Sequence, residues 1–223
     1  MGRPWPARLG KPPAAAASSS SKLLFGDATL IGGTGNAAAN GDNLQLTLPD
    51  GTAAMTHSNG LSGMFRALVW DLGSDVGSFD AVLKWVTRQP GIEICVGVAR
   101  LASAPTTLAD LETDSHFMQV KETDTGRVST YLKEESDGLT SGTAENKLNS
   151  TQVLYQCTID SVGFGPHQLR HDMGTDGIQG RPGSATTAVS SGTFYAFCAW
   201  AAQSAVSGSD ETTEITLTGG IRS

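Results

Sequence analysis

The chain has little charge, few cysteines and no long hydrophobic run, and each absence narrows the choice of function. Charged residues make up 17% of its 223 residues, below the roughly one quarter that is usual in soluble domains. Cys95, Cys157 and Cys198 are far apart and odd in number, which favours buried reduced thiols over a disulfide framework. No run approaches the roughly 18 apolar residues of a membrane helix, and Pro4 and Pro6 interrupt any secretory signal. We therefore expect no membrane association.

One segment matches a cofactor-binding motif in its residues, but not in the structure expected around it. The segment 33–38 matches the G-x-G-x-x-A pattern of dinucleotide-binding loops. Such a loop must open a helix whose N-terminus faces the pyrophosphate, but the turn-forming segment 40–43 follows almost at once. Asp50 has a suitable spacing for a ribose contact, yet it belongs to a Pro-Asp-Gly turn. The pattern indicates a glycine-rich loop between strands, and no cofactor.

The histidines do not form a convincing metal site. His167 and His171 are four residues apart, beside Asp172, and would share one face of a helix. Pro166 and the neighbouring glycines argue against a helix there. On a strand the two histidines would be about 13 Å apart, which is too far for one metal ion. We expect no bound metal.

Catalytic arrangements are also missing from the sequence. There is no G-x-S-x-G nucleophile elbow. The acidic residues of 134–137 are almost consecutive in a polar segment, where solvated surface acids are more common than a glycosidase pair. The same interpretation applies to Asp210, Glu211 and Glu214. The expectation from sequence is a protein that is not an enzyme.

What the chain does contain is 24 threonines, 22 serines and 27 glycines, together with many short apolar runs. The clearest run alternates Ile92, Ile94, Val96 and Val98 with other residues, which is typical of a strand with one buried face. Thr106–Leu111 is the best candidate for a short helix, because a hydroxyl residue precedes a pair of leucines. About ten strand signals without intervening helices predict an all-β fold, namely an antiparallel sandwich or jelly roll. The predicted strands lie within 23–31, 44–48, 64–70, 79–85, 92–98, 116–121, 127–133, 153–159, 194–200 and 215–217.

Two polar, glycine-containing stretches, 134–150 and 163–192, separate some of these strands. The first is expected to be an exposed loop, and the second a long loop with one strand at most. Trp70, Trp85 and Trp200 stand within apolar runs, so we expect them in the core.

The first 22 residues differ from the rest and are expected to form an extended arm before a β-sandwich body at 23–223. They carry four basic residues and no acid, +4 in all, so that a net charge of -7 leaves -11 on the body. Four charges are too few for convincing nucleic-acid binding. Trp5 lies between two prolines and has no local core to enter, so it suits a pocket on a neighbouring subunit. The predicted partner-binding residues are Arg3, Trp5, Arg8 and Lys11.

A proline- and serine-rich arm followed by a charge-poor Thr/Ser/Gly-rich β body resembles structural proteins of tailed bacteriophage virions. The resemblance covers the whole chain and includes no diagnostic motif. Head decoration proteins of this kind often use a jelly roll and dock by extended arms. The resemblance implies a virion protein that stabilises a capsid surface, with the major capsid protein or other virion subunits as partners. It also implies a homo-oligomer, for which a trimer is one option.

A second interpretation remains open from the sequence. The body could be a receptor- or carbohydrate-binding β-sandwich of a tail fibre or lectin-like protein. Recognition would then fall to 134–150 and 163–192.

Overall fold

The computed structural model describes residues 23–54, 65–74, 78–87, 92–113, 115–122, 127–134, 138–146, 152–159, 164–172, 178–183 and 192–222. Within 112–183 the description covers the backbone.

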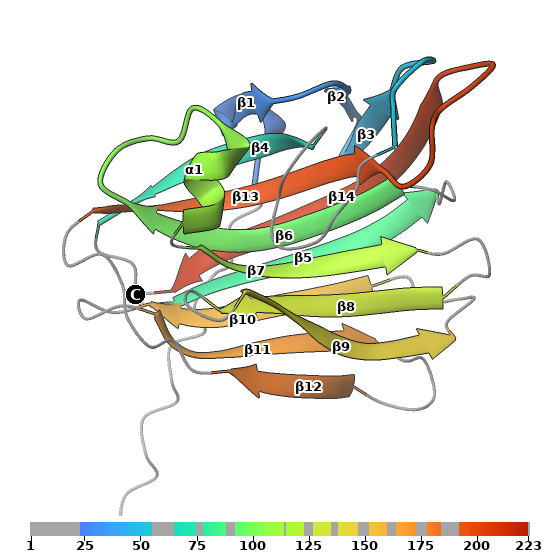
Figure 1. Ribbon diagram of the computed structural model, residues 1–223. Coiled ribbons are helices and arrows are strands. Elements are labelled where there is room, and N and C mark those ends of the chain that lie inside the picture. Colours follow the sequence, from blue (N-terminus) through green and yellow to red (C-terminus); the bar gives the residue numbers. More distant parts are fainter. Residues whose placement is uncertain are drawn as a thin grey trace, which may run out of the picture.

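Two seven-stranded antiparallel sheets lie face to face, so the predicted all-β sandwich is confirmed (Figure 1). The front sheet in Figure 1 has the order β1 (Thr29–Gly32), β4 (Arg66–Gly73), β13 (Thr193–Ala202), β6 (Ile92–Leu101), β7 (Ser115–Glu122), β8 (Arg127–Glu134) and β9 (Gly138–Asn146). The back sheet has the order β12 (Ile178–Gly183), β11 (Phe164–Asp172), β10 (Gln152–Ile159), β5 (Ser78–Thr87), β14 (Glu211–Arg222), β3 (Asn43–Leu48) and β2 (Asn36–Asn40).

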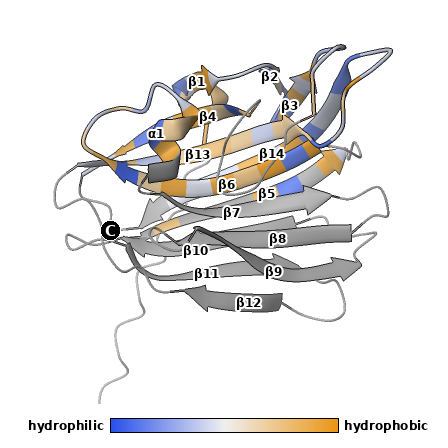
Figure 2. Cartoon of the chain, in the orientation of Figure 1, coloured by the Kyte–Doolittle hydropathy of each residue, from blue (hydrophilic) through white to orange (hydrophobic). Residues whose placement is uncertain are grey.

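The main core lies between the sheets. On β6 the alternating residues Ile94, Val96 and Val98 point inward, as their period of two requires. Across from them, Leu46 and Ile215 of the back sheet are fully buried. Figure 2 shows hydrophobic colour along much of β4, β13 and β6, and hydrophilic colour on parts of β14. Burying these faces is the principal source of stability for such a fold.

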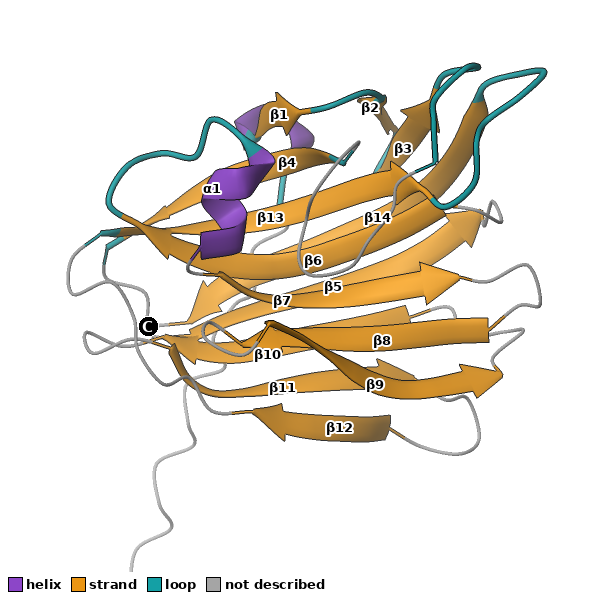
Figure 3. Ribbon diagram, viewed as in Figure 1, coloured by secondary structure: helices purple, strands orange, loops and turns teal. Residues whose placement is uncertain are grey.

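A second apolar layer covers part of the outer face of the front sheet. Helix α1 (Leu108–Thr113) places Leu108 and Leu111 over that face, where Phe197 and Val69 join the same cluster. Figure 3 shows this helix lying across the front sheet. Gly32, at the end of β1, has φ of +83°, and a Cβ there would approach Leu108 Cγ to 2.8 Å. A glycine is required because both the backbone angle and the close packing exclude a side chain.

The helix predicted at Thr106–Leu111 is confirmed, with its start two residues later. A short 3-10 turn, η1 (Phe25–Asp27), was not expected. The expectation of a loop at 134–150 is wrong in part, because β9 occupies Gly138–Asn146. The interpretation of 163–192 is also wrong in part, since it contains both β11 and β12. These three strands lie at or next to sheet edges, where less apolar surface is buried, so their sequences lack a strong alternation.

Candidate ligand-binding face

The predicted partner-binding residues Arg3, Trp5, Arg8 and Lys11 lie outside the described residues, as does the whole arm 1–22. The described part of the chain offers another candidate, on the outer face of the front sheet. Because paired residues of neighbouring antiparallel strands share a face, the strand register defines rows of residues that cross this face.

Three such rows cross β6 and are named here by their β6 residue. Each is read across the sheet from the first strand to the last. The Glu93 row contains Ala201, Glu93, Lys121, Ser129 and Ala144. The Cys95 row contains Ala67, Ala199, Cys95, Gln119, Tyr131 and Ser141. The Gly97 row contains Val69, Phe197, Gly97, Phe117, Lys133 and Leu139.

The residues that these rows place on β4 and β13 are apolar, and helix α1 packs over this part of the face. Val69, Phe197 and Ala199 are buried and belong to the cluster beneath α1. This half of the face is occupied by the protein's own helix and serves packing.

The β7 and β8 positions of the same rows differ in residue type. The register places Gln119 beside Tyr131, and Phe117 beside Lys133. Lysine and glutamine are residue types that are rarely buried completely. The rows therefore run from a packed apolar half to a half rich in amides, amines and aromatic rings.

Glu93 stands at the boundary between the two halves. Its side chain is only 2% exposed, although it is charged and lies on a strand whose residues are mostly apolar. Burial raises the pKa of the neighbouring Cys95 thiol, and the negative charge of Glu93 raises it further. Buried charged groups that perturb their neighbours are concentrated at functional sites, which marks Glu93 as the first residue to test.

The arrangement suits a ligand that offers many hydroxyl groups. Aromatic rings supply flat apolar contact, and amide and amine groups donate or accept hydrogen bonds. From Phe117 to Lys121 the face extends about 13 Å along β7. Sequence analysis missed this face because it requires knowing which strands are neighbours. The available signal was an acid, Glu93, within the alternating run 92–98.

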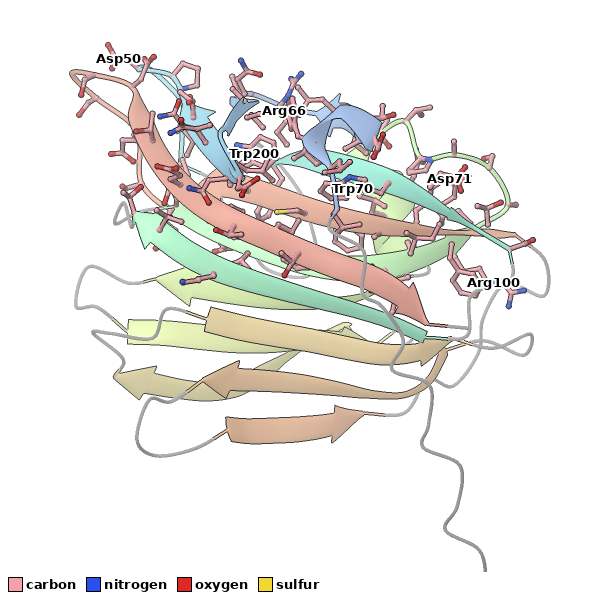
Figure 4. All side chains as sticks on the ribbon, turned by 180° about the vertical axis from the view of Figure 1, so that it is seen from behind. Asp50, Arg66, Trp70, Asp71, Arg100 and Trp200 are labelled. Carbon is pink, nitrogen blue, oxygen red and sulfur yellow. The ribbon has the colours of Figure 1, made fainter. Side chains whose placement is uncertain are left out.

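The outer face of the back sheet has a different character. Asn43 Nδ2 donates to Glu214 Oε1 at 2.7 Å, and the Thr216 hydroxyl donates to Asn43 Oδ1 at 2.7 Å. Asn40 Nδ2 reaches the same glutamate oxygen at 3.3 Å. These side chains satisfy one another, so this face is a solvated polar ladder. Figure 4 shows it from behind, with β14 facing the reader.

Other sequence expectations can now be placed. Of the segment 33–38, expected to be a glycine-rich loop, residues 33–35 connect β1 to β2, while 36–38 already belong to β2; no helix follows them. His167 and His171 both lie on β11, four residues apart on a strand. Asp50 accepts a hydrogen bond from Gly208 N at 2.9 Å, in keeping with a role in a turn. Within the described residues no group of acids, histidines or cysteines could hold a metal ion.

The buried thiols and tryptophans also follow expectation where they are described. Cys95 and Cys198 are buried and free, while the Cys157 side chain lies outside the description. Trp70 is 3% exposed and Trp200 is fully buried. None of the described helices is long and apolar enough to cross a membrane.

Comparisons with known proteins give a fold and no family. No protein-family model matches the sequence, and no curated protein is similar to it in sequence. A functionally unknown protein from Saccharomyces cerevisiae aligns with a TM-score of 0.55 and 9% identity, over 90% of this chain and 100% of that chain. The GlcNAcα1-4Gal-releasing endo-β-galactosidase from Clostridium perfringens aligns with a TM-score of 0.53 and 6% identity, over 96% of this chain and 64% of that chain. A β-glucanase from Bacillus licheniformis gives 0.50 and 9%, over 94% and 100%.

The chain thus has a jelly-roll β-sandwich fold that is shared with glycoside hydrolases. This overturns the expectation that the protein is not an enzyme, because two of these structural neighbours are enzymes that act on sugars. The exclusion rested on finding no acid pair close together in the sequence. In a sandwich, acids from separate strands can converge, so sequence spacing gave no ground for it. The fold is compatible with a binding or a structural role.

Proposed function

We propose that the protein binds a carbohydrate chain on the outer face of its front sheet, across β6, β7 and β8. The observation that carries this proposal is the change along the three rows, from buried apolar residues under α1 to polar and aromatic residue types beyond Glu93. A continuous chain of sugars can lie along such a face, using hydroxyl groups for hydrogen bonds and ring faces for aromatic contact.

The location differs from the one that the sequence favoured. Recognition was expected in loops at 134–150 and 163–192, but β9, β11 and β12 occupy much of these stretches. Strands hold their side chains more rigidly than loops, which reduces the entropy lost on binding. A sheet face is therefore a better platform for an extended ligand.

Glu93 raises the question of cleavage on the same face. Hydrolysis of a glycosidic bond by two carboxyl groups requires them about 5–10 Å apart. Cys95 follows Glu93 on the same face of β6, and Ala201 and Lys121 stand beside it in register. These positions supply no second acid, so the proposal is limited to binding and the test below also measures cleavage.

The first test is a glycan-array screen of the purified protein, followed by calorimetry on the strongest ligand. We expect Tyr131→Ala to weaken binding by about 10-fold, the scale of a lost aromatic contact. Thr212→Ala, at an exposed position of the back sheet, is the matched control and should bind as the wild type. Reducing-sugar release is measured in the same samples, with Glu93→Gln as the variant for any turnover.

Two results would contradict the proposal. One is unchanged affinity in Tyr131→Ala and Gln119→Ala, both with wild-type melting temperatures. The other is loss of affinity in Thr212→Ala, which would move the site to the back sheet.

A second proposal concerns where the protein acts, and it rests on the arm. A basic segment 1–22 and an acidic remainder, +4 against -11, favour docking of the arm on a neighbouring subunit. We propose that the arm attaches the body to a virion surface, with capsid or other virion subunits as partners and a homo-oligomer as the attached form. Deletion of residues 2–22 should abolish co-sedimentation with particles from the same source. Co-sedimentation of the truncated protein would refute the attachment without affecting the carbohydrate proposal.

A further inference from the structure

Arg100 is a buried cation at one end of the sandwich. It lies on β6 with its side chain between the sheets, and only 6% of its surface is exposed. Its guanidinium carbon lies 4.9 Å from the centre of the Phe194 ring. Figure 4 shows Arg100 at the margin of the described strands, near the ends of β6 and β14.

Two of the three nitrogens of this guanidinium lack a hydrogen-bond partner. Nε and Nη1 are buried and have no hydrogen-bond acceptor. Among the described residues no carboxylate pairs with Arg100, and Asp71, on β4 two strands away from β6, accepts instead from Gly73 N at 2.9 Å. The Phe194 ring stabilises the positive charge but accepts none of the in-plane N–H groups.

Arg66 also has a buried Nε without a hydrogen-bond partner, but it differs from Arg100 because its Nη1 is bonded. Arg66, on β4, donates from Nη1 to the carbonyl oxygens of Gly32 and Gly33 at 3.1 and 2.7 Å. Arg66 thereby stabilises the backbone at the end of β1 and the start of the loop that follows. Arg100 has no such role, although it is more buried.

An unpaired buried charge is destabilising unless an anion joins it. A carboxylate matches the planar fork of a guanidinium and can accept two parallel hydrogen bonds from it. We propose that Arg100 is the receptor for one carboxylate group, delivered by a small organic acid or a sugar acid, at this end of the sandwich. The site is separate from the outer face of the front sheet and does not depend on sugar binding there.

The test measures thermal stability of the full chain against increasing acetate or glucuronate, with chloride at equal ionic strength as the reference. Ligand that binds only the folded state raises the melting temperature. We expect a rise in both carboxylates over chloride, and a shift of the Arg100 Nε–H signal by NMR. A larger effect with glucuronate would indicate a sugar acid, and equal effects a small organic acid.

Arg100→Gln should weaken the carboxylate dependence by about 10- to 100-fold, the range for charge-assisted hydrogen bonds. Arg66→Met is the matched control and should keep the wild-type response. Arg100→Met in chloride should melt at or above the wild-type temperature, because it removes an unpaired buried charge.

Three results would overturn the proposal. They are a wild type that responds equally to acetate, glucuronate and chloride, an Arg100→Gln variant that responds as the wild type does, and a large loss of stability in Arg100→Met in chloride. The last would mean that Arg100 already has an anionic partner in the free protein.

Discussion

Trp70 Nε1 donates a hydrogen bond of 3.0 Å to the carbonyl oxygen of Leu24. Trp70 lies on β4 in the main core and is 3% exposed, whereas Leu24 belongs to the segment before β1. The bond therefore attaches the first described residues of the chain to β4, the second strand of the front sheet.

Replacing Trp70 by Phe should test that attachment. The variant loses the donor and leaves the Leu24 carbonyl without it, which we expect to cost about 1–2 kcal/mol more than the loss of ring volume alone. Trp200→Phe is a suitable reference, because Trp200 is also buried but its Nε1 has no acceptor. Urea unfolding of both variants measures the difference, and hydrogen exchange at 24–28 should rise only in Trp70→Phe. Equal destabilisation of the two variants would show that the bond contributes nothing.

The ladder on the back sheet should contribute stability as a unit. Asn43 bonds with Glu214 and Thr216, and the residues of the first pair lie 171 positions apart in sequence. Asn43→Ala should reduce the free energy of unfolding by about 1–2 kcal/mol. A double-mutant cycle of Asn43→Ala with Glu214→Ala should give a coupling energy of about 0.5–1.5 kcal/mol. Thr212→Ala, on the same strand as Glu214, should be neutral, and additive effects in the cycle would refute the pairing.

The two buried thiols should resist chemistry until the protein unfolds. Burial raises the pKa of the Cys198 thiol from 9.0 to about 12, and burial also raises that of Cys95. The thiolate is the reactive form, so iodoacetamide at pH 8 should leave both residues unmodified in the folded protein. Peptide mapping in a Cys157→Ser background gives the site of any modification. Rapid labelling of Cys95 or Cys198 without denaturant would contradict their burial.

The same shift predicts how stability varies at alkaline pH. Above pH 9 the unfolded thiols lose protons while the folded thiols keep them, so the folded state binds more protons and stability falls as pH rises. For Cys198 the slope is about 1.4 kcal/mol per pH unit between roughly pH 9 and pH 12, and the raised pKa of Cys95 adds a slope of the same sign above pH 9. Cys198→Ala should remove part of this slope when urea unfolding is compared at pH 8 and pH 10.5. An unchanged slope in that variant would count against the shift.

Asp110 should stabilise the start of α1 only when it is ionised. Hydrogen bonds from the backbone of Thr106 and Thr107 lower the pKa of its carboxyl group. A lowered folded-state pKa gives stability that is present above the unfolded value of 3.8 and is lost as pH falls through the folded value. Asp110→Asn should cost about 0.5 kcal/mol at pH 7, a small effect because the group is largely exposed. The difference from wild type should vanish near pH 2, and a difference that persists there would point to packing instead.

Much of the fold could be predicted from the local pattern of the sequence. The alternation of Ile92, Ile94, Val96 and Val98 specifies a strand with one face in the main core, since successive side chains point to opposite faces. The turn at Asp50, the helix near Leu108 and the burial of Trp70 and Trp200 were likewise predictable, because each depends on neighbouring residues or on hydrophobicity.

The candidate sites could not be obtained in that way. The significance of Glu93 depends on which strands lie on either side of β6, and the two unpaired nitrogens of Arg100 are known only from the three-dimensional arrangement. The expectation that the protein is not an enzyme was wrong for the same reason, because only acids close in sequence were considered, and catalytic acids need to be close in space.

The sequence by itself determined that the chain is an antiparallel β-sandwich with one short helix. It also showed that residues 1–22 differ in composition and charge from the rest. Strand periodicity, turn chemistry and charge distribution are local properties, so they can be read from sequence. Only the tertiary structure decided which strands are neighbours, which half of the front sheet α1 covers and which buried charges lack partners. Those properties depend on strand order and register, and a one-residue change of register would send every side chain to the opposite face.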